Sequence, residues 1–355
     1  MQPSPGPVFA SPPRSTAPSK GYALRSARTR RCSGPRKDPD ARAGGRSALL
    51  RPSRAGGEER FAGFEEPQAA RGRPNGGMNS LPADAVPEPA PALRRSRLAV
   101  SLVVVATFLA VNAIGLHPFR ALAGDLQGWP RMLALAGLGY GLYLLAPLAV
   151  AAWLAGPRRA LPVLGLSASP WPALGLALGC SAIVLAGLAA TSTPLPADRL
   201  ALELVRSALL PGIAEELLFR AFLFGFLFRF AGWGFLPAAL LSSLVFGLEH
   251  VWQGGDPVEA AGIALLTGVG GLWWSWLLVE WRWNLWVPIA FHVLLNGYWT
   301  AFDAADNALG SGMSVALRLG CMLLSIIATL ALARRRGGRR LTGRRWLRGP
   351  AHAQA

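Results

Sequence analysis

The chain has 355 residues, of which 52% are hydrophobic and only 15% are charged, and its formal net charge is +17. A water-soluble domain usually carries about 25% charged residues, so this deficit argues against a soluble enzyme and indicates a bilayer protein. The basic excess lies in the tails, since residues 1–97 hold 18 Lys and Arg against 8 acids and residues 334–355 hold 8 Arg and no acid. The body at 98–333 holds 10 basic and 11 acidic residues, which argues against a nucleic-acid binder.

The first 93 residues are rich in Pro, Gly, Ala, Ser and Arg and show no sustained apolar period. Such a segment buries too little apolar surface to offset the entropy lost on ordering, so we predict a disordered tail over 1–93. The tail also lacks the apolar stretch of a secretory signal peptide. Met78 opens the segment "MNSLPADAV", and we hypothesise that the native chain starts there.

From residue 98 onward, apolar stretches alternate with short polar connections. Each stretch is close to the roughly 20 residues that cross about 30 Å of hydrocarbon, so we predict an all-α polytopic membrane bundle of about eight helices. The membrane domain covers 94–333 and is followed by a basic tail over 334–355. We place the spans near 98–116, 132–155, 171–190, 203–228, 233–251, 258–280, 284–302 and 312–333.

Arginines occupy every second connection, whereas the connections between them are acidic. Arg158 and Arg159 follow the second span and Arg282 follows the sixth, while Asp198 and Asp256 lie in the opposite set. The positive-inside bias then predicts a multi-pass protein of the cell inner (plasma) membrane with both termini in the cytoplasm. We expect the basic C-terminal tail to be cytoplasmic and to lie against anionic membrane lipid.

The fourth span, "LLPGIAEELLFRAFLFGF", carries Glu215, Glu216 and Arg220 among apolar residues. Charges at the centre of a membrane cost several kcal/mol, so they need partners or a function. Glu216 and Arg220 are four residues apart and share a helix face, which predicts an ion pair. Glu215 is rotated by about 100° from Glu216 and is left for chemistry. The alternative is a purely structural ion cluster that joins helices.

Two histidines also fall inside predicted spans. His250 lies in the fifth, and His292 lies in the seventh, where Asn296 follows four residues later on the same face. A single histidine on an apolar helix is more often a satisfied core residue than a catalyst. Two histidines, an aligned amide and a Glu-Glu-x-x-x-Arg element together can supply a base, a proton shuttle and oxyanion donors.

This ordered set resembles the CAAX protease and bacteriocin-processing family of intramembrane endopeptidases, which includes the prenyl-protein endoproteases. That family is marked by Glu-Glu-x-x-x-Arg, Phe-x-x-x-His and His-x-x-x-Asn on successive membrane helices. Here the three elements stand intact at 215–220, 246–250 and 292–296. The similar region covers about 130–305, and its diagnostic part covers roughly 203–300.

The resemblance implies an intramembrane endopeptidase that cleaves a membrane-associated peptide or protein terminus, in a cavity that opens toward the cytoplasm in the prenyl proteases. By residue-by-residue comparison, Glu215 and His250 would activate water, and His292 and Asn296 would stabilise the oxyanion. Glu216 and Arg220 would then orient the site.

Two readings of the chemistry follow from these residues. Glu215, His250 and His292 could hold zinc with an open position for water. A metal-free hydrolysis that needs no cofactor fits the same residues, and we favour it because no His-Glu-x-x-His motif is present. Glu249, beside the second-motif histidine, either joins the cavity or points outward, and we expect the outward orientation.

The alternative function is a non-catalytic membrane scaffold or immunity factor of the same fold, which would have no need for Glu215 or His292. An ion-coupled transporter would explain intramembrane Glu and His as a proton relay. It predicts internal repeat symmetry, which the spans do not show.

Overall fold

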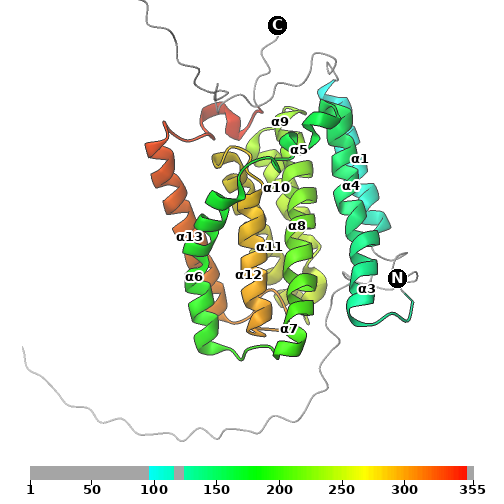
Figure 1. The fold of residues 1–355 in the computed structure, drawn as a ribbon. Coiled ribbons are helices and arrows are strands. Elements are labelled where there is room, and N and C mark those ends of the chain that lie inside the picture. Colours follow the sequence, from blue (N-terminus) through cyan, green and yellow to red (C-terminus); the bar gives the residue numbers. More distant parts are fainter. Residues whose placement is uncertain (1–95, 116–123, 350–355) are drawn as a thin grey trace, which may run out of the picture. The chain divides into compact units, whose positions relative to one another are not determined.

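The computed structural model describes residues 96–115 and 124–349, and this part of the chain is helical throughout (Figure 1). Within it no β-strand forms, and an isolated bridge between Trp233 and Arg348 is the only β-type pairing given for these residues. The predicted all-α class is therefore confirmed. The predicted tail over 1–93 and its start at Met78 lie outside the described residues.

Eight helical passes succeed one another in the described ranges, and two of them, the second and the fourth, combine α- and π-helical segments. The fourth pass is the most divided, with α7, η3, α8, η4 and α9 running head to tail. The bounds are α1 Arg97–Ile114; α3 Gly128–Leu135, η1 Ala136–Tyr140 and α4 Gly141–Ala155; α6 Pro170–Thr191; α7 Ala197–Leu204, η3 Val205–Leu209, α8 Leu210–Glu215, η4 Glu216–Phe224 and α9 Gly225–Arg229; α10 Phe235–Leu248; α11 Pro257–Glu280; α12 Trp286–Ala301; and α13 Gly312–Arg335. The connections hold four short helices, namely η2 Pro157–Arg159, α5 Ala160–Val163, η5 Val251–Gln253 and η6 Gly343–Trp346.

Six of these passes are long and apolar enough to cross a membrane, by length and composition. The remaining two are α12, which has only 16 residues, and the fourth pass, which is divided and carries the charged residues of the site. Both are helical where the sequence predicts spans. The described chain is thus a multi-pass membrane protein, and the count of eight crossings stays a prediction.

Local sequence signals set the ends of several helices. Asp256 precedes α11, and its side-chain Oδ1 accepts hydrogen bonds from the backbone N–H groups of Val258 and Glu259 at 2.8 and 2.9 Å. Pro257 fills the first helical position, where no donor is needed. Gly156 follows α4 with φ of +83°, a backbone conformation that favours glycine and ends the helix.

The fourth pass forms the centre of the bundle. Every residue from Glu216 to Arg229 is buried, and η4 packs against α1, α4, α10 and α11. α12 runs antiparallel to this pass: Leu195 donates a backbone hydrogen bond to Ala301, and farther along Gly212 lies against Val293. Figure 1 shows α10, α11 and α12 next to α8 of this pass.

The bundle has two chemically different ends. At the arginine end, which we define as 156–169, 229–235, 280–286 and 336–349, the C-terminal segment folds back so that Gly349 N–H donates to the Gly232 carbonyl. At the acidic end, which we define as 192–198, 249–259 and 302–312, Ala308 N–H donates to the Gln253 side chain at 2.8 Å. Successive helices therefore place the basic and acidic connections on opposite sides, as the charge pattern predicts.

Candidate active site

The two adjacent glutamates lie where α8 passes into the π-helical segment η4. A π-helical turn shifts the angular positions of the side chains that follow, and such turns are frequent at functional sites. Glu216 is fully buried, whereas the side chain of Glu215 keeps 22% of its surface exposed. The predicted divergence of the two carboxylates is therefore observed.

Glu216 forms the predicted ion pair with Arg220. Arg220 Nη1 lies 3.2 Å from Glu216 Oε1, and the arginine side chain is 1% exposed. Its guanidinium carbon lies 3.9 Å from the ring centre of Phe246 and 5.1 Å from that of Trp274. The faces of these two rings thus stabilise the positive charge of the guanidinium, which is buried away from water.

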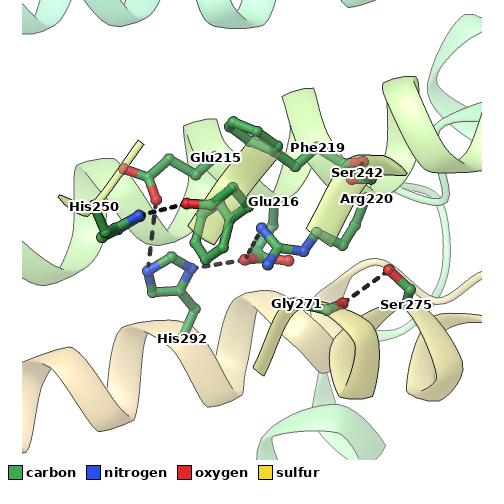
Figure 2. A network of polar contacts seen from close by, with 10 residues as sticks. Glu215, Glu216, Phe219, Arg220, Ser242, His250, Gly271, Ser275 and His292 are labelled. Carbon is green, nitrogen blue, oxygen red and sulfur yellow. Dashed lines mark hydrogen bonds and ion pairs between the residues drawn. The ribbon is translucent and has the colours of Figure 1, made fainter. Parts of the chain in front are cut away.

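His292 bridges the two glutamates. Its Nδ1 lies 2.7 Å from Glu216 Oε1, and its Nε2 lies 3.9 Å from Glu215 Oε2 (Figure 2). The shorter distance is a hydrogen bond, and the longer one is beyond hydrogen-bond reach. A carboxylate that accepts the Nδ1 proton fixes the imidazole tautomer and leaves Nε2 facing Glu215.

Figure 2 draws His250 beside both Glu215 and His292. Its Nδ1 is 2.7 Å from the Phe246 carbonyl oxygen, which can only accept, so this nitrogen carries a proton. The Phe246 ring packs against the His250 ring with centres 4.7 Å apart. His250 therefore presents Nε2 as its remaining proton acceptor.

Asn296 lies one turn beyond His292 on α12, but its described contact is outside the charged network. Its Nδ2 donates to the Ser207 carbonyl of η3 at 3.2 Å. This bond joins α12 to the fourth pass on the side of the acidic end. The structure thus brings Glu215, Glu216, Arg220, His250 and His292 together and places Asn296 beside them.

Trp274 and Gly271 are site residues that the sequence did not reveal. The Trp274 ring stacks on the His292 ring with centres 4.7 Å apart and planes inclined by 24°. A Cβ atom at Gly271 would lie 2.9 Å from Arg220 Nη2, so glycine leaves room for the guanidinium. In the sequence both residues lie within an apolar helix, where an aromatic residue usually indicates packing alone.

Glu249 also belongs to the surroundings of the site. Its side chain is half-buried and interacts electrostatically with Glu215 and with Tyr143 of α4. The expected outward orientation of Glu249 is therefore wrong. It is the C-terminal cap residue of α10, where the helix ends.

The proposed zinc ligands can be compared with this geometry. Across 96–115 and 124–349, no three His, Cys, Asp or Glu side chains are arranged as a metal site. His292 Nδ1 and His250 Nδ1 are bonded to protein oxygens, which would leave one nitrogen on each ring for a ligand. The ligand set Glu215, His250 and His292 stays a prediction.

In a comparison with protein families, residues 197–298 match the family described as type II CAAX prenyl endopeptidase Rce1-like. All six predicted site residues fall inside this segment. No curated protein and no solved structure matches the chain. The match confirms the resemblance seen in the three motifs: residues 197–298 are similar to the type II CAAX prenyl endopeptidase Rce1-like family.

Proposed function

We propose that this chain is an intramembrane endopeptidase that hydrolyses a peptide bond near the end of a membrane-associated peptide or protein. The family match supports a protease of the CAAX type. The observation that carries the catalytic assignment is the placement of His292 between a buried glutamate at 2.7 Å and a partly exposed glutamate at 3.9 Å.

In the proposed reaction, Glu215 takes a proton from water as the water oxygen attacks the scissile carbonyl carbon. Glu215 is the carboxylate suited to this step because it is the exposed member of the pair, while Glu216 is occupied by Arg220 and His292. The proton then passes to the leaving amine when the C–N bond breaks. We assign His250, whose Nε2 is its remaining proton acceptor, to assist this transfer.

His292 would serve the oxyanion. In this role His292 acts as the imidazolium: Nδ1–H donates to Glu216, and Nε2–H points toward the space beside Glu215, where negative charge develops on the carbonyl oxygen. Asn296 has a second amide hydrogen beyond the one donated to Ser207, and this hydrogen is available to the same oxygen. Neither His292 nor Asn296 needs a cofactor for this role. The alternative is that a zinc ion held by Glu215, His250 and His292 would activate the water.

The test compares a strain that lacks the gene with strains that express wild type, Glu215→Gln, His292→Ala or Glu203→Gln. Glu203 is a matched control because it is a glutamate of the same pass that pairs with Arg206 outside the site. Mass spectrometry of membrane-protein termini should show the same uncleaved ends in the knockout, Glu215→Gln and His292→Ala strains. Loss of a general base typically costs about 10²–10⁴-fold in rate.

The Glu203→Gln strain should match wild type, and all variants should be present at wild-type levels in the membrane. Unchanged termini in both site variants would refute the protease. If the termini were unchanged but a protein that co-purifies with wild type were lost from the Glu215→Gln variant, the non-catalytic scaffold would become the better proposal.

A further inference from the structure

A single hydrogen bond holds the His292 ring at one atom and leaves the plane of the ring to other contacts. Nδ1 lies 2.7 Å from Glu216 Oε1, and a hydrogen bond of this kind tolerates misalignment of about 30°. A tilt of that size about Nδ1 moves Nε2, on the far side of the ring, by about 1 Å. A displacement of about 1 Å at a catalytic group can cost about 10²-fold in rate. The proposed oxyanion role of Nε2 therefore requires a further contact that fixes the ring plane.

Two aromatic rings supply such contacts. The Trp274 ring stacks on the His292 ring with centres 4.7 Å apart and planes inclined by 24°. The Phe246 ring meets the same imidazole edge-on, with centres 6.4 Å apart and planes at 85°. A stacked pair of flat rings resists tilting, because a tilt drives the edge of one ring into the face of the other. Trp274, which lies outside the three motifs, is thus the flat support of the imidazole.

Trp274 is itself held in place by its surroundings. It lies in the C-terminal half of α11 with 7% of its surface exposed. Its ring packs against those of Phe246 and Trp273, with centres 6.5 and 5.8 Å apart, and α11 packs against α10, α12 and α13. A close-packed interior leaves little room for a second orientation of so large a ring. The indole can therefore serve as a fixed reference for the histidine.

The neighbouring tryptophan shows what an indole with a purely structural role does in this helix. Trp273 donates its Nε1 hydrogen to Ser325 Oγ at 2.9 Å and so joins α11 to α13. Trp274 Nε1 is buried and has no hydrogen-bond acceptor in the part of the chain that the structure describes. Buried tryptophans usually have such an acceptor, so hydrogen bonding does not explain a tryptophan at 274. Its contribution to the site is the face of its ring.

That face also suits the charges beside it. The guanidinium carbon of Arg220 lies 5.1 Å from the Trp274 ring centre, and Arg220 and His292 both pair with Glu216 Oε1. When His292 is the imidazolium, two cations therefore lie against one carboxylate. The electron-rich face of tryptophan attracts cations more strongly than that of phenylalanine, and an aliphatic side chain offers no such face.

From these contacts we propose that Trp274 is a positioning residue of the reaction, whose indole face sets the plane of the His292 ring and thereby the direction of Nε2–H toward the oxyanion. Trp274 acts through His292 and touches no reacting atom. The inference rests on the proposed endopeptidase function, although the orientation of the ring can be measured without catalysis.

The experiment uses the full chain in detergent, labelled with ¹⁵N and ¹³C at its four histidines, and records the imidazole signals by NMR. The His292 signals are those that disappear in His292→Gln. Wild type is compared with Trp274→Leu, Trp274→Phe and Trp273→Leu. Trp273→Leu is the matched control, because Trp273 is the adjacent residue, is also 7% exposed and packs on Phe291 with ring centres 5.0 Å apart.

In wild type, the ring current of the stacked indole should shift the carbon-bound imidazole protons of His292 upfield. Trp274→Leu should remove this shift and change the Nδ1 signal, because the hydrogen bond to Glu216 loosens. Trp274→Phe should retain part of the upfield shift, and Trp273→Leu should leave both signals unchanged.

Cleavage should follow the orientation of the ring and not the stability of the protein. The rate at which cleaved membrane-protein ends appear should fall about 10²-fold in Trp274→Leu. It should recover most of that loss in Trp274→Phe and stay near wild type in Trp273→Leu. Both leucine variants should lower the thermal unfolding temperature, since each replaces a large buried side chain by a smaller one.

Wild-type His292 signals in Trp274→Leu would overturn the inference, whatever the cleavage rate. Equal loss of cleavage in Trp274→Leu and Trp273→Leu would also overturn it, because packing alone would then account for the effect. Failure of the proposed function is a different result, since wild type itself would then leave the same membrane-protein ends as the strain that lacks the gene.

Discussion

Glu216 holds the centre of the site because one of its oxygens serves two partners. Oε1 accepts from His292 Nδ1 at 2.7 Å and lies 3.2 Å from Arg220 Nη1, and neither Glu216 nor Arg220 can be solvated. The arginine neutralises the carboxylate, and the carboxylate in turn orients the histidine. Charge balance and catalytic geometry therefore depend on the same atom.

Removing one member of this pair should be worse than removing both. Arg220→Met leaves a buried carboxylate without its counter-charge, which typically costs about 3–5 kcal/mol. The double variant Glu216→Gln with Arg220→Met buries no unpaired charge, and we expect it to recover most of the lost stability. Thermal unfolding in detergent, followed by the loss of monodisperse protein, measures both variants against wild type.

The double variant should nevertheless lack activity, because an amide at 216 accepts from His292 more weakly than a carboxylate. If the single Arg220→Met variant were as stable as wild type, Arg220 would not be the main stabilising partner of Glu216.

Close helix approach supplies the geometry that side-chain chemistry alone cannot. A Cβ atom at Gly212 would lie 2.5 Å from Val293 Cγ2, so glycine lets α8 reach α12 and brings Glu216 to His292. Gly271 does the same for α11, where a Cβ atom would meet Arg220 Nη2 at 2.9 Å and Ser243 Oγ at 3.2 Å. The site thus requires small residues on two of the helices that form it.

Neighbouring glycines of α11 provide a controlled test of this packing. Gly271→Ala should displace the Arg220 guanidinium and lower both thermal stability and cleavage. Gly270→Ala introduces a Cβ atom with nothing within 4 Å, so it should be neutral or gain about 0.5–1 kcal/mol from helix propensity. Equal behaviour of the two variants, measured by thermal unfolding and by the membrane-protein termini, would contradict the close fit at Gly271.

Helical periodicity explains why much of the site could be predicted from the sequence. Spacing of four residues predicts the Glu216–Arg220 pair, and the observed ion pair confirms it. The same rule puts His292 and Asn296 on one face of α12, but it does not indicate that Asn296 bonds to Ser207. That contact depends on how η3 lies against α12, and tertiary packing of this kind leaves no local pattern.

The π-helical segments and the role of Trp274 were likewise beyond local rules. The residues of η4 have the apolar composition of any buried helix, and Trp274 is one of three tryptophans within four positions of α11. Only the partners, His292 and Arg220, distinguish it from a packing residue. The predicted spans were found more readily because their length and composition report directly on the bilayer.

At the scale of the whole molecule, the C-terminal segment closes the arginine end instead of remaining apart as a tail. Glu280, the last residue of α11, accepts hydrogen bonds from the backbone N–H groups of Arg340 and Leu341 at 2.9 and 3.2 Å. Leu341 is 0% exposed, and the Trp346 ring packs edge-on against Phe235 with centres 5.3 Å apart. This segment therefore covers the arginine end of the bundle.

Truncation after Arg335 should consequently destabilise the bundle, whereas truncation after Gly349 keeps these contacts and should not. Leu341→Ala is a smaller change with the same expected direction, since replacing a fully buried leucine by alanine typically lowers the free energy of unfolding by about 2–5 kcal/mol. Thermal unfolding in detergent measures the stability of all three variants. A tail that served only to attract lipid would leave unfolding unchanged after either truncation, because its arginines would then interact with the membrane and not with the bundle. The backbone hydrogen bonds to Glu280 and the burial of Leu341 favour the structural role, in which the basic segment packs against the arginine end of the bundle.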